Sequence, residues 1–92
     1  MTDKEILEAI KAGKKLSSEI LEDLVYGDEG VVKREVVSLE DVYANMTTII
    51  KLEQEYIAID WTRDNHWGEG EFTSQPYLVK PVEKLVTDYI PV

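Results

Sequence analysis

Near the start of the chain, apolar residues recur every three to four positions behind a helix-start signal. Thr2 and Glu5 have the spacing of a capping box, in which the side chain of each residue bonds to the backbone amide of the other. The apolar positions that follow are Ile6, Leu7 and Ile10. Because Gly13 can adopt the left-handed conformation that closes a helix, this pattern predicts a short helix from Asp3 to Ala12.

A second apolar stripe follows a short polar connection. Ser17 is a favourable N-cap residue, and Leu16 and Leu21 stand on either side of it at the spacing of a hydrophobic staple. The stripe consists of Ile20, Leu21, Leu24 and Val25. These features predict a second helix that begins after Ser17 and ends at Gly27.

From residue 31 onward the pattern changes to β-branched residues and then to alternation. Four valines between residues 31 and 37 predict a first strand. Residues 45–52 and 56–61 then alternate apolar and polar side chains on either side of Glu53-Gln54-Glu55, which predicts a β-hairpin. One face of this hairpin would seat the two helices with Ile50, Leu52, Ile57, Ile59 and Trp61.

The last third of the chain mixes turn residues with short apolar segments. Residues 62–76 contain Gly68, Gly70 and Pro76 and predict a long loop. Two further strands are predicted at Tyr77–Val79 and Val82–Ile90, with Pro81 confined to an edge or a bend. Because a terminal strand exposes unpaired backbone groups, pairing of this strand with a second copy, as a homodimer, stays open as an alternative.

Taken together, these elements predict an α+β fold. Two short N-terminal helices would be followed by an antiparallel β-meander of about three to five strands. The length of 92 residues suits one small domain, helical in residues 1–27 and β-rich in residues 31–92.

Charge and cysteine content narrow the classes of function. The chain carries 19 acidic and 10 basic residues, a formal net charge of −9, and no cysteine. Its only adjacent basic pairs are Lys14-Lys15 and Lys33-Arg34, so we expect no direct binding to nucleic acid. The negative charge fits either a solvated surface or an acidic face that docks on a basic protein groove.

The same composition predicts a cytoplasmic protein. The N-terminus carries acidic residues where a secretory signal needs basic ones, and no apolar run is long enough to span a bilayer. Without cysteine, disulfides and zinc-thiolate sites are excluded.

Metal binding and catalysis have weak signals. The closest group of oxygen and nitrogen ligands is Asp60, Asp64, His66, Glu69 and Glu71, whose spacing matches no calcium loop or zinc motif. His66 is the only side chain with an ordinary pKa near neutrality, and Ser74 lacks the sequence context of a nucleophile. We therefore predict a protein that is not an enzyme and that needs no metal or cofactor.

The two tryptophans receive different interpretations. Trp61 continues the apolar face of the hairpin and is predicted to lie in the core. Trp67 stands in the loop, where burial and an exposed role in binding are both open. Aromatic and arginine side chains inside a polar rim are typical of interfaces, so the predicted partner-binding residues are Arg63, Asp64, His66, Trp67, Glu69 and Glu71.

The closing half of the chain resembles small uncharacterised proteins encoded by bacteriophages and prophages of Gram-positive bacteria. The resemblance covers about residues 45–92 and lies in Thr48–Leu52, Tyr56–Arg63, Phe72–Tyr77, Val82–Lys84 and Tyr89–Val92. In those proteins the loop usually begins with a glycine after the arginine, whereas Asp64–Gly68 stands here. The resemblance supplies no catalytic residue.

A phage setting suggests an analogy with small acidic inhibitors such as anti-CRISPR proteins and DNA mimics, which occupy basic nucleic-acid channels of host enzymes. Our leading hypothesis is a phage accessory protein that binds and inhibits a host protein with a basic surface, through acidic residues and the 63–71 loop. The alternative is a homo-oligomeric structural protein with no external ligand.

Overall fold

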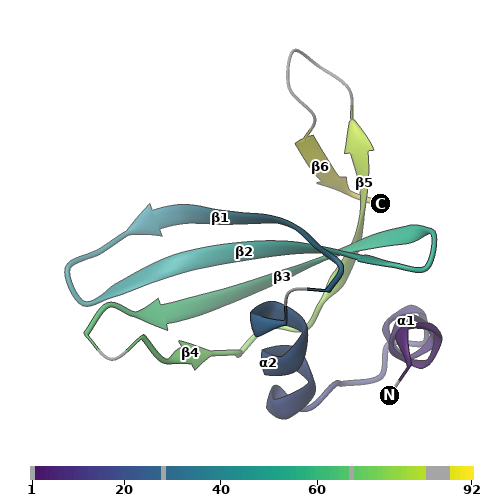
Figure 1. The fold of residues 1–92 in the computed structure, drawn as a ribbon, viewed down its shortest axis with the longest axis horizontal. Coiled ribbons are helices and arrows are strands. Elements are labelled where there is room, and N and C mark those ends of the chain that lie inside the picture. The colour runs from purple at the N-terminus through teal and green to yellow at the C-terminus, as the bar shows by residue number, and fades with distance from the viewer. Residues whose placement is uncertain (1, 28, 67, 83–87) are drawn as a thin grey trace.

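The computed structural model describes residues 2–27, 29–66, 68–82 and 88–92. Two helices precede an antiparallel sheet, which confirms the predicted α+β class (Figure 1). The helices are α1 (Asp3–Lys11) and α2 (Ser18–Tyr26). The strands in these ranges are β1 (Val31–Leu39), β2 (Tyr43–Leu52), β3 (Glu55–Asp64), β4 (Gly70–Glu71), β5 (Tyr77–Val82) and β6 (Asp88–Pro91).

The start of α1 is the predicted capping box. The Glu5 amide donates to Thr2 Oγ1 at 3.2 Å, and the Thr2 amide donates to Glu5 Oε1 at 3.1 Å. Hydrogen bonds from the Thr2 backbone and side chain lower the pKa of Glu5 below its ordinary value. The helix ends with Ala12 as C-cap, and Gly13 follows in the left-handed region at φ +74°.

Helix α2 also begins and ends where the sequence predicts. Ser17 Oγ accepts from the Ile20 amide at 3.3 Å, and the Gly27 amide closes the last turn on the Asp23 carbonyl. Arg34 of β1 donates through Nη2 to the carbonyls of Val25 and Gly27, at 3.2 and 3.3 Å. A cation therefore lies at the negative end of the helix and satisfies carbonyls that have no partner within it.

The strand order is β1-β2-β3-β5-β6, with β4 also paired to β3. The long hairpin of β2 and β3 runs in register from Tyr43 opposite Asp64 to Leu52 opposite Glu55. The outer strand β1 is irregular, because its register with β2 shifts between Val31 and Lys33 and again between Val36 and Ser38. Such shifts are β-bulges, which bend a strand and redirect its side chains.

The region predicted as a long loop is partly strand. β3 continues to Asp64, and β4 returns to pair with it, Glu71 opposite Thr62 and Gly70 opposite Arg63. A Cβ on Gly70 would meet the Tyr26 hydroxyl and would lie 3.0 Å from a ring carbon of Trp61. Glycine thus lets β4 approach β3 beneath the aromatic ring of α2, a tertiary effect that local composition does not reveal.

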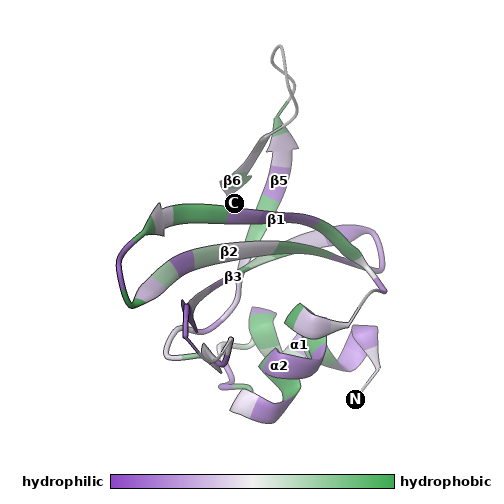
Figure 2. Ribbon diagram, turned by 60° about the vertical axis from the view of Figure 1, so that its left-hand side comes forward, coloured by the Kyte–Doolittle hydropathy of each residue, from purple (hydrophilic) through white to green (hydrophobic). Residues whose placement is uncertain are grey.

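The main core lies between the helices and one face of the sheet, which we call the helix face. Both helices cover this face, and their apolar sides turn toward it (Figures 1 and 2). The predicted apolar face of the hairpin is confirmed, since Ile57 and Ile59 are fully buried and Trp61 is 7% exposed. The buried residues of this core are Ile6, Leu7, Leu16, Leu21, Val25, Ala44, Met46, Ile50, Leu52, Ile57, Ile59 and Trp61.

The opposite face of the sheet, the open face, has a smaller apolar cluster at one end. Ile49, Ala58 and Val79 are buried there, and three tyrosines, Tyr56, Tyr77 and Tyr89, pack against them. A cleft of about 60 Å³ at this place is bordered by both outer strands, β1 and β6. The sheet is therefore curled, with its open face concave.

The C-terminal part forms a β-ribbon of β5 and β6 that extends away from the helices (Figure 1). β5 is longer than predicted, because it continues through Pro81, which pairs with Tyr89. β6 lies at the edge of the sheet, and residues 83–87 of the predicted last strand lie outside the described residues. Within the described residues, neither helix has the length and apolar character needed to cross a membrane.

Candidate functional site

Two turns meet at the end of the sheet farthest from the β2–β3 turn. The β1–β2 turn folds on itself through a bond from the Glu40 amide to the Tyr43 carbonyl, at 2.8 Å. Asn65, which follows β3, donates its amide to the Val42 carbonyl and its Nδ2 to the Glu40 carbonyl, both at 2.9 Å. These bonds join two segments about 25 residues apart in the chain and hold them as one unit.

The connection from β3 to β4 is a closed turn. The Asp64 amide donates to the Glu69 carbonyl at 2.7 Å, and the Gly68 amide donates to the Asp64 carbonyl at 2.8 Å. Asp64 Oδ1 also accepts from the His66 amide at 2.7 Å, a bond typical of an Asx turn. Gly68 adopts φ +73°, which is why glycine suits this position.

Five carboxylates gather on these two turns, and we call this region the acidic end. Its residues are Glu40, Asp41, Asp64, Glu69 and Glu71, of which all but Asp64 are exposed. Exposed apolar side chains lie in the same part of the chain, Leu39 with 69%, Val42 with 64% and Tyr43 with 42% of their surface exposed.

The predicted partner-binding residues fall on different faces. Strand alternation places Asp64 and Glu71 toward the open face and Arg63 toward the helix face. Arg63 lies near Tyr26, where burial and the Glu22 charge raise the pKa of the phenol while the Arg63 charge opposes this rise. His66 is exposed in the turn, and Trp67 lies outside the described residues. Among the predicted residues that the structure describes, Arg63 therefore lies on a different face from Asp64 and Glu71.

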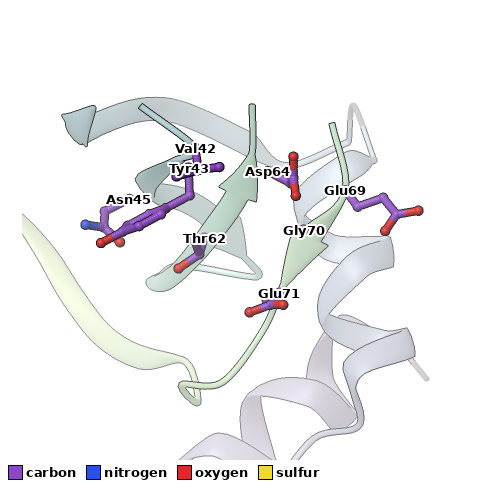
Figure 3. A pocket seen from close by; sticks show the side chains of 8 residues that line it. All are labelled: Val42, Tyr43, Asn45, Thr62, Asp64, Glu69, Gly70 and Glu71. Carbon is purple, nitrogen blue, oxygen red and sulfur yellow. The ribbon is translucent and has the colours of Figure 1, made fainter. Parts of the chain in front are cut away.

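A groove runs along the concave open face. Its larger part, of about 560 Å³, is lined by Val42, Tyr43, Asn45, Thr62, Asp64, Glu69, Gly70 and Glu71 (Figure 3). Its second part, of about 430 Å³, is lined by Val37, Asn45, Met46, Thr47, Asp60, Trp61, Thr62, Thr73 and Ser74. Because Asn45 and Thr62 line both parts, the two parts adjoin, and we call them together the open-face groove.

Asp60 lines the second part of the groove, where it belongs to a small polar network. Its Oδ1 accepts from the Thr47 hydroxyl at 2.7 Å and from the Tyr77 hydroxyl at 3.3 Å. Burial raises the pKa of Tyr77, and the negative charge and hydrogen bond of Asp60 raise it further. The carboxylate is thus oriented by hydroxyl groups on both sides and keeps its second oxygen for other donors.

Several groove residues have only a weak signal in the sequence. The alternation of Asn45 and Thr47 on one strand, and of Asp60 and Thr62 on the next, could have indicated a shared polar face. The position of Val37 in the groove could not be predicted from strand alternation, because it depends on a bulge in β1. In Figure 3 the Tyr43 ring lies beside Asn45. The Glu69 side chain points away from both of these residues.

Among the described residues, no three histidine, aspartate or glutamate side chains come close enough together to hold a metal ion. Ser74 lines the second part of the groove, whereas His66 is exposed in the turn that follows β3.

The fold and site define a small α+β domain in which the helices cover one sheet face and the other, concave face carries a groove. Comparison of the chain with protein-family models, with curated proteins and with solved structures finds no match.

Proposed function

We propose that this chain is a non-enzymatic binding protein that docks through its acidic end on a basic surface of a partner protein. The observation that carries the proposal is the acidic end itself, whose exposed carboxylates lie on the same two turns as exposed Val42 and Tyr43. Apolar side chains within a charged rim are typical of protein interfaces. The bonds from Asn65 to the β1–β2 turn fix this surface before binding, which lowers the entropic cost of association.

We further propose that the partner is a protein of a bacterial host and that the chain is a cytoplasmic phage accessory protein that inhibits it. The resemblance of residues 45–92 to phage and prophage proteins supports this origin. The net charge of −9 supports a partner with a basic channel, such as a nucleic-acid-handling defence enzyme. Inhibition would then follow from competition with nucleic acid for that channel.

Affinity capture from a Gram-positive bacterial lysate tests the proposal. The tip variant carries Glu40→Lys with Asp41→Lys, and the matched control carries Glu8→Lys with Asp23→Lys on the exposed sides of the helices. We expect wild type and control to retain the same protein at low salt and the tip variant to lose it. High salt should release the protein from both, because screening weakens charge attraction. Equal capture by the tip variant would contradict the proposal.

A homo-oligomer is the second candidate. Val36 and Leu39 are 49% and 69% exposed on the outer strand β1, and a second copy could cover them. Light scattering at micromolar concentration separates the two candidates, because a dimer supports the homo-oligomer and a monomer removes it.

A further inference from the structure

The open-face groove has one apolar wall. Val37, Val42 and Tyr43 line it and are 63%, 64% and 42% exposed. Val37 is the extra residue of a bulge in β1, between Val36 and Ser38, and the bulge places its side chain at the groove. Apolar side chains that converge on one concavity while exposed are a feature of binding surfaces.

The charged residues that line the groove all have the same sign of charge. Among the described residues that line its two parts, every charged residue is acidic, namely Asp60, Asp64, Glu69 and Glu71, although the Glu69 side chain points away from Tyr43 and Asn45. The nearest cation on β3, Arg63, belongs to the helix face. Neutral hydroxyl and amide groups of Asn45, Thr47 and Thr62 lie between the carboxylates and the apolar wall.

We propose that the open-face groove seats one extended segment of the partner that carries basic side chains; this inference rests on the proposed function. The aliphatic stems of arginine or lysine pack on Val37, Val42 and the Tyr43 ring, and their charged ends bind Asp60 and Glu71. Arginine fits best, because its planar guanidinium donates two parallel hydrogen bonds to a carboxylate. The second oxygen of Asp60 is oriented for this by the Thr47 and Tyr77 hydroxyls.

Charge argues against other occupants. Nucleic acid and acidic peptides would be repelled by the carboxylates of the groove. A second copy carries a net charge of −9, so charge repulsion opposes its approach as well. A basic segment from another protein is the occupant that complements both the charge and the apolar wall.

The test uses a fluorescein-labelled peptide of alternating arginine and valine, with a peptide of alternating glutamate and valine as its charge control. Fluorescence anisotropy with the full chain at low salt should show binding of the first peptide only. Asp60→Asn with Glu71→Gln should weaken this binding about tenfold or more. The matched pair Asp23→Asn with Glu8→Gln removes the same charge from the helices and should change affinity by less than about threefold.

The apolar wall has its own matched pair. Val37→Ser should weaken peptide binding, whereas Val92→Ser, at a valine that is 79% exposed near the C-terminus, should not. Amide NMR shifts on peptide addition should move at Thr47 and Thr62 and stay fixed in α1. These spectra also show whether each variant is folded.

Equal weakening by the groove pair and the helix pair would overturn the inference, since binding would then depend on net charge alone. Absence of peptide binding by folded wild type would overturn it as well. Neither result touches partner capture by the acidic end, which is tested separately with the tip variant. Conversely, if the groove variants bind normally to the captured partner while the tip variant does not, the proposed function stands and the inference fails.

Discussion

Thr48 is a polar residue in the middle of an apolar core. Its side chain is fully buried, and its hydroxyl accepts from Trp61 Nε1 at 3.0 Å across β2 and β3. The indole N–H would otherwise be buried without a partner, which costs free energy because hydration is lost and not replaced. This pair explains how Trp61 can occupy the core beneath α2.

We expect Thr48→Val to lower the free energy of unfolding by about 1 to 3 kcal/mol, because the indole N–H loses its acceptor. Valine has nearly the same shape and favours strands, so neither packing nor strand propensity accounts for such a loss. Urea unfolding, followed by circular dichroism, measures the change. Thr48→Ser is the control: it keeps the hydroxyl and loses only a methyl group. A valine variant as stable as wild type would show that the bond contributes nothing net.

At the scale of single residues, contacts between residues close in the sequence could be predicted, whereas contacts between residues far apart in the sequence could not. The capping box of Thr2 and Glu5 and the N-cap Ser17 depend on residues three positions apart, so the sequence shows them directly. The bond from Asn65 to the Glu40 carbonyl joins residues that only the folded sheet brings together. Of the carboxylates at the acidic end, Asp64, Glu69 and Glu71 were therefore among the predicted partner-binding residues, whereas Glu40 and Asp41 were not.

At the scale of the elements, hydrogen bonds from Arg34 of β1 connect the C-terminal end of α2 to the sheet. Arg34 donates to the Val25 and Gly27 carbonyls, and no intrahelical amide is available to the last carbonyls of a helix. The positive charge at this end also complements the helix dipole. The bond thus fixes the C-terminal turn of α2 against the edge of the sheet.

Arg34→Met should lower the free energy of unfolding by about 1 kcal/mol and fray the last turn of α2. The free energy of unfolding of Arg34→Lys should lie between those of wild type and Arg34→Met, because lysine keeps the charge but lacks the planar guanidinium. Hydrogen exchange of the Gly27 amide, which bonds to the Asp23 carbonyl, reports this end specifically. Lys14→Met, at an exposed lysine between the helices, is the control. Unchanged Gly27 exchange in the methionine variant would contradict the role.

Element order and type followed from periodicity, and the exceptions have physical reasons. The hairpin of β2 and β3 was predictable because its alternation is regular over both strands. β4 was missed because two residues are too short for a pattern and because its position depends on Gly70 fitting beneath Tyr26. The irregular alternation of the valines in β1 was a signal of its two bulges.

For the whole molecule, the outer strand β1 decides whether copies associate. Its apolar side chains favour association, while two bulges interrupt its edge and Lys33, Arg34 and Glu35 place charges between them. Bulges and charges are the features by which proteins prevent edge-to-edge pairing. Each copy also carries a net charge of −9, which adds repulsion at low salt.

We therefore expect a monomer in sedimentation velocity over a micromolar concentration range. Deleting Val37 tests the reason, because the register would then run without a shift from Val36 opposite Met46 to Ser38 opposite Asn45 and Leu39 opposite Ala44. The edge that results keeps only the shift between Val31 and Lys33 and should pair with a second copy, so the deletion variant should sediment as a dimer or larger species. Val37→Ser keeps the bulge and should stay monomeric. A monomeric deletion variant would show that the bulge at Val37 is not what keeps the copies apart.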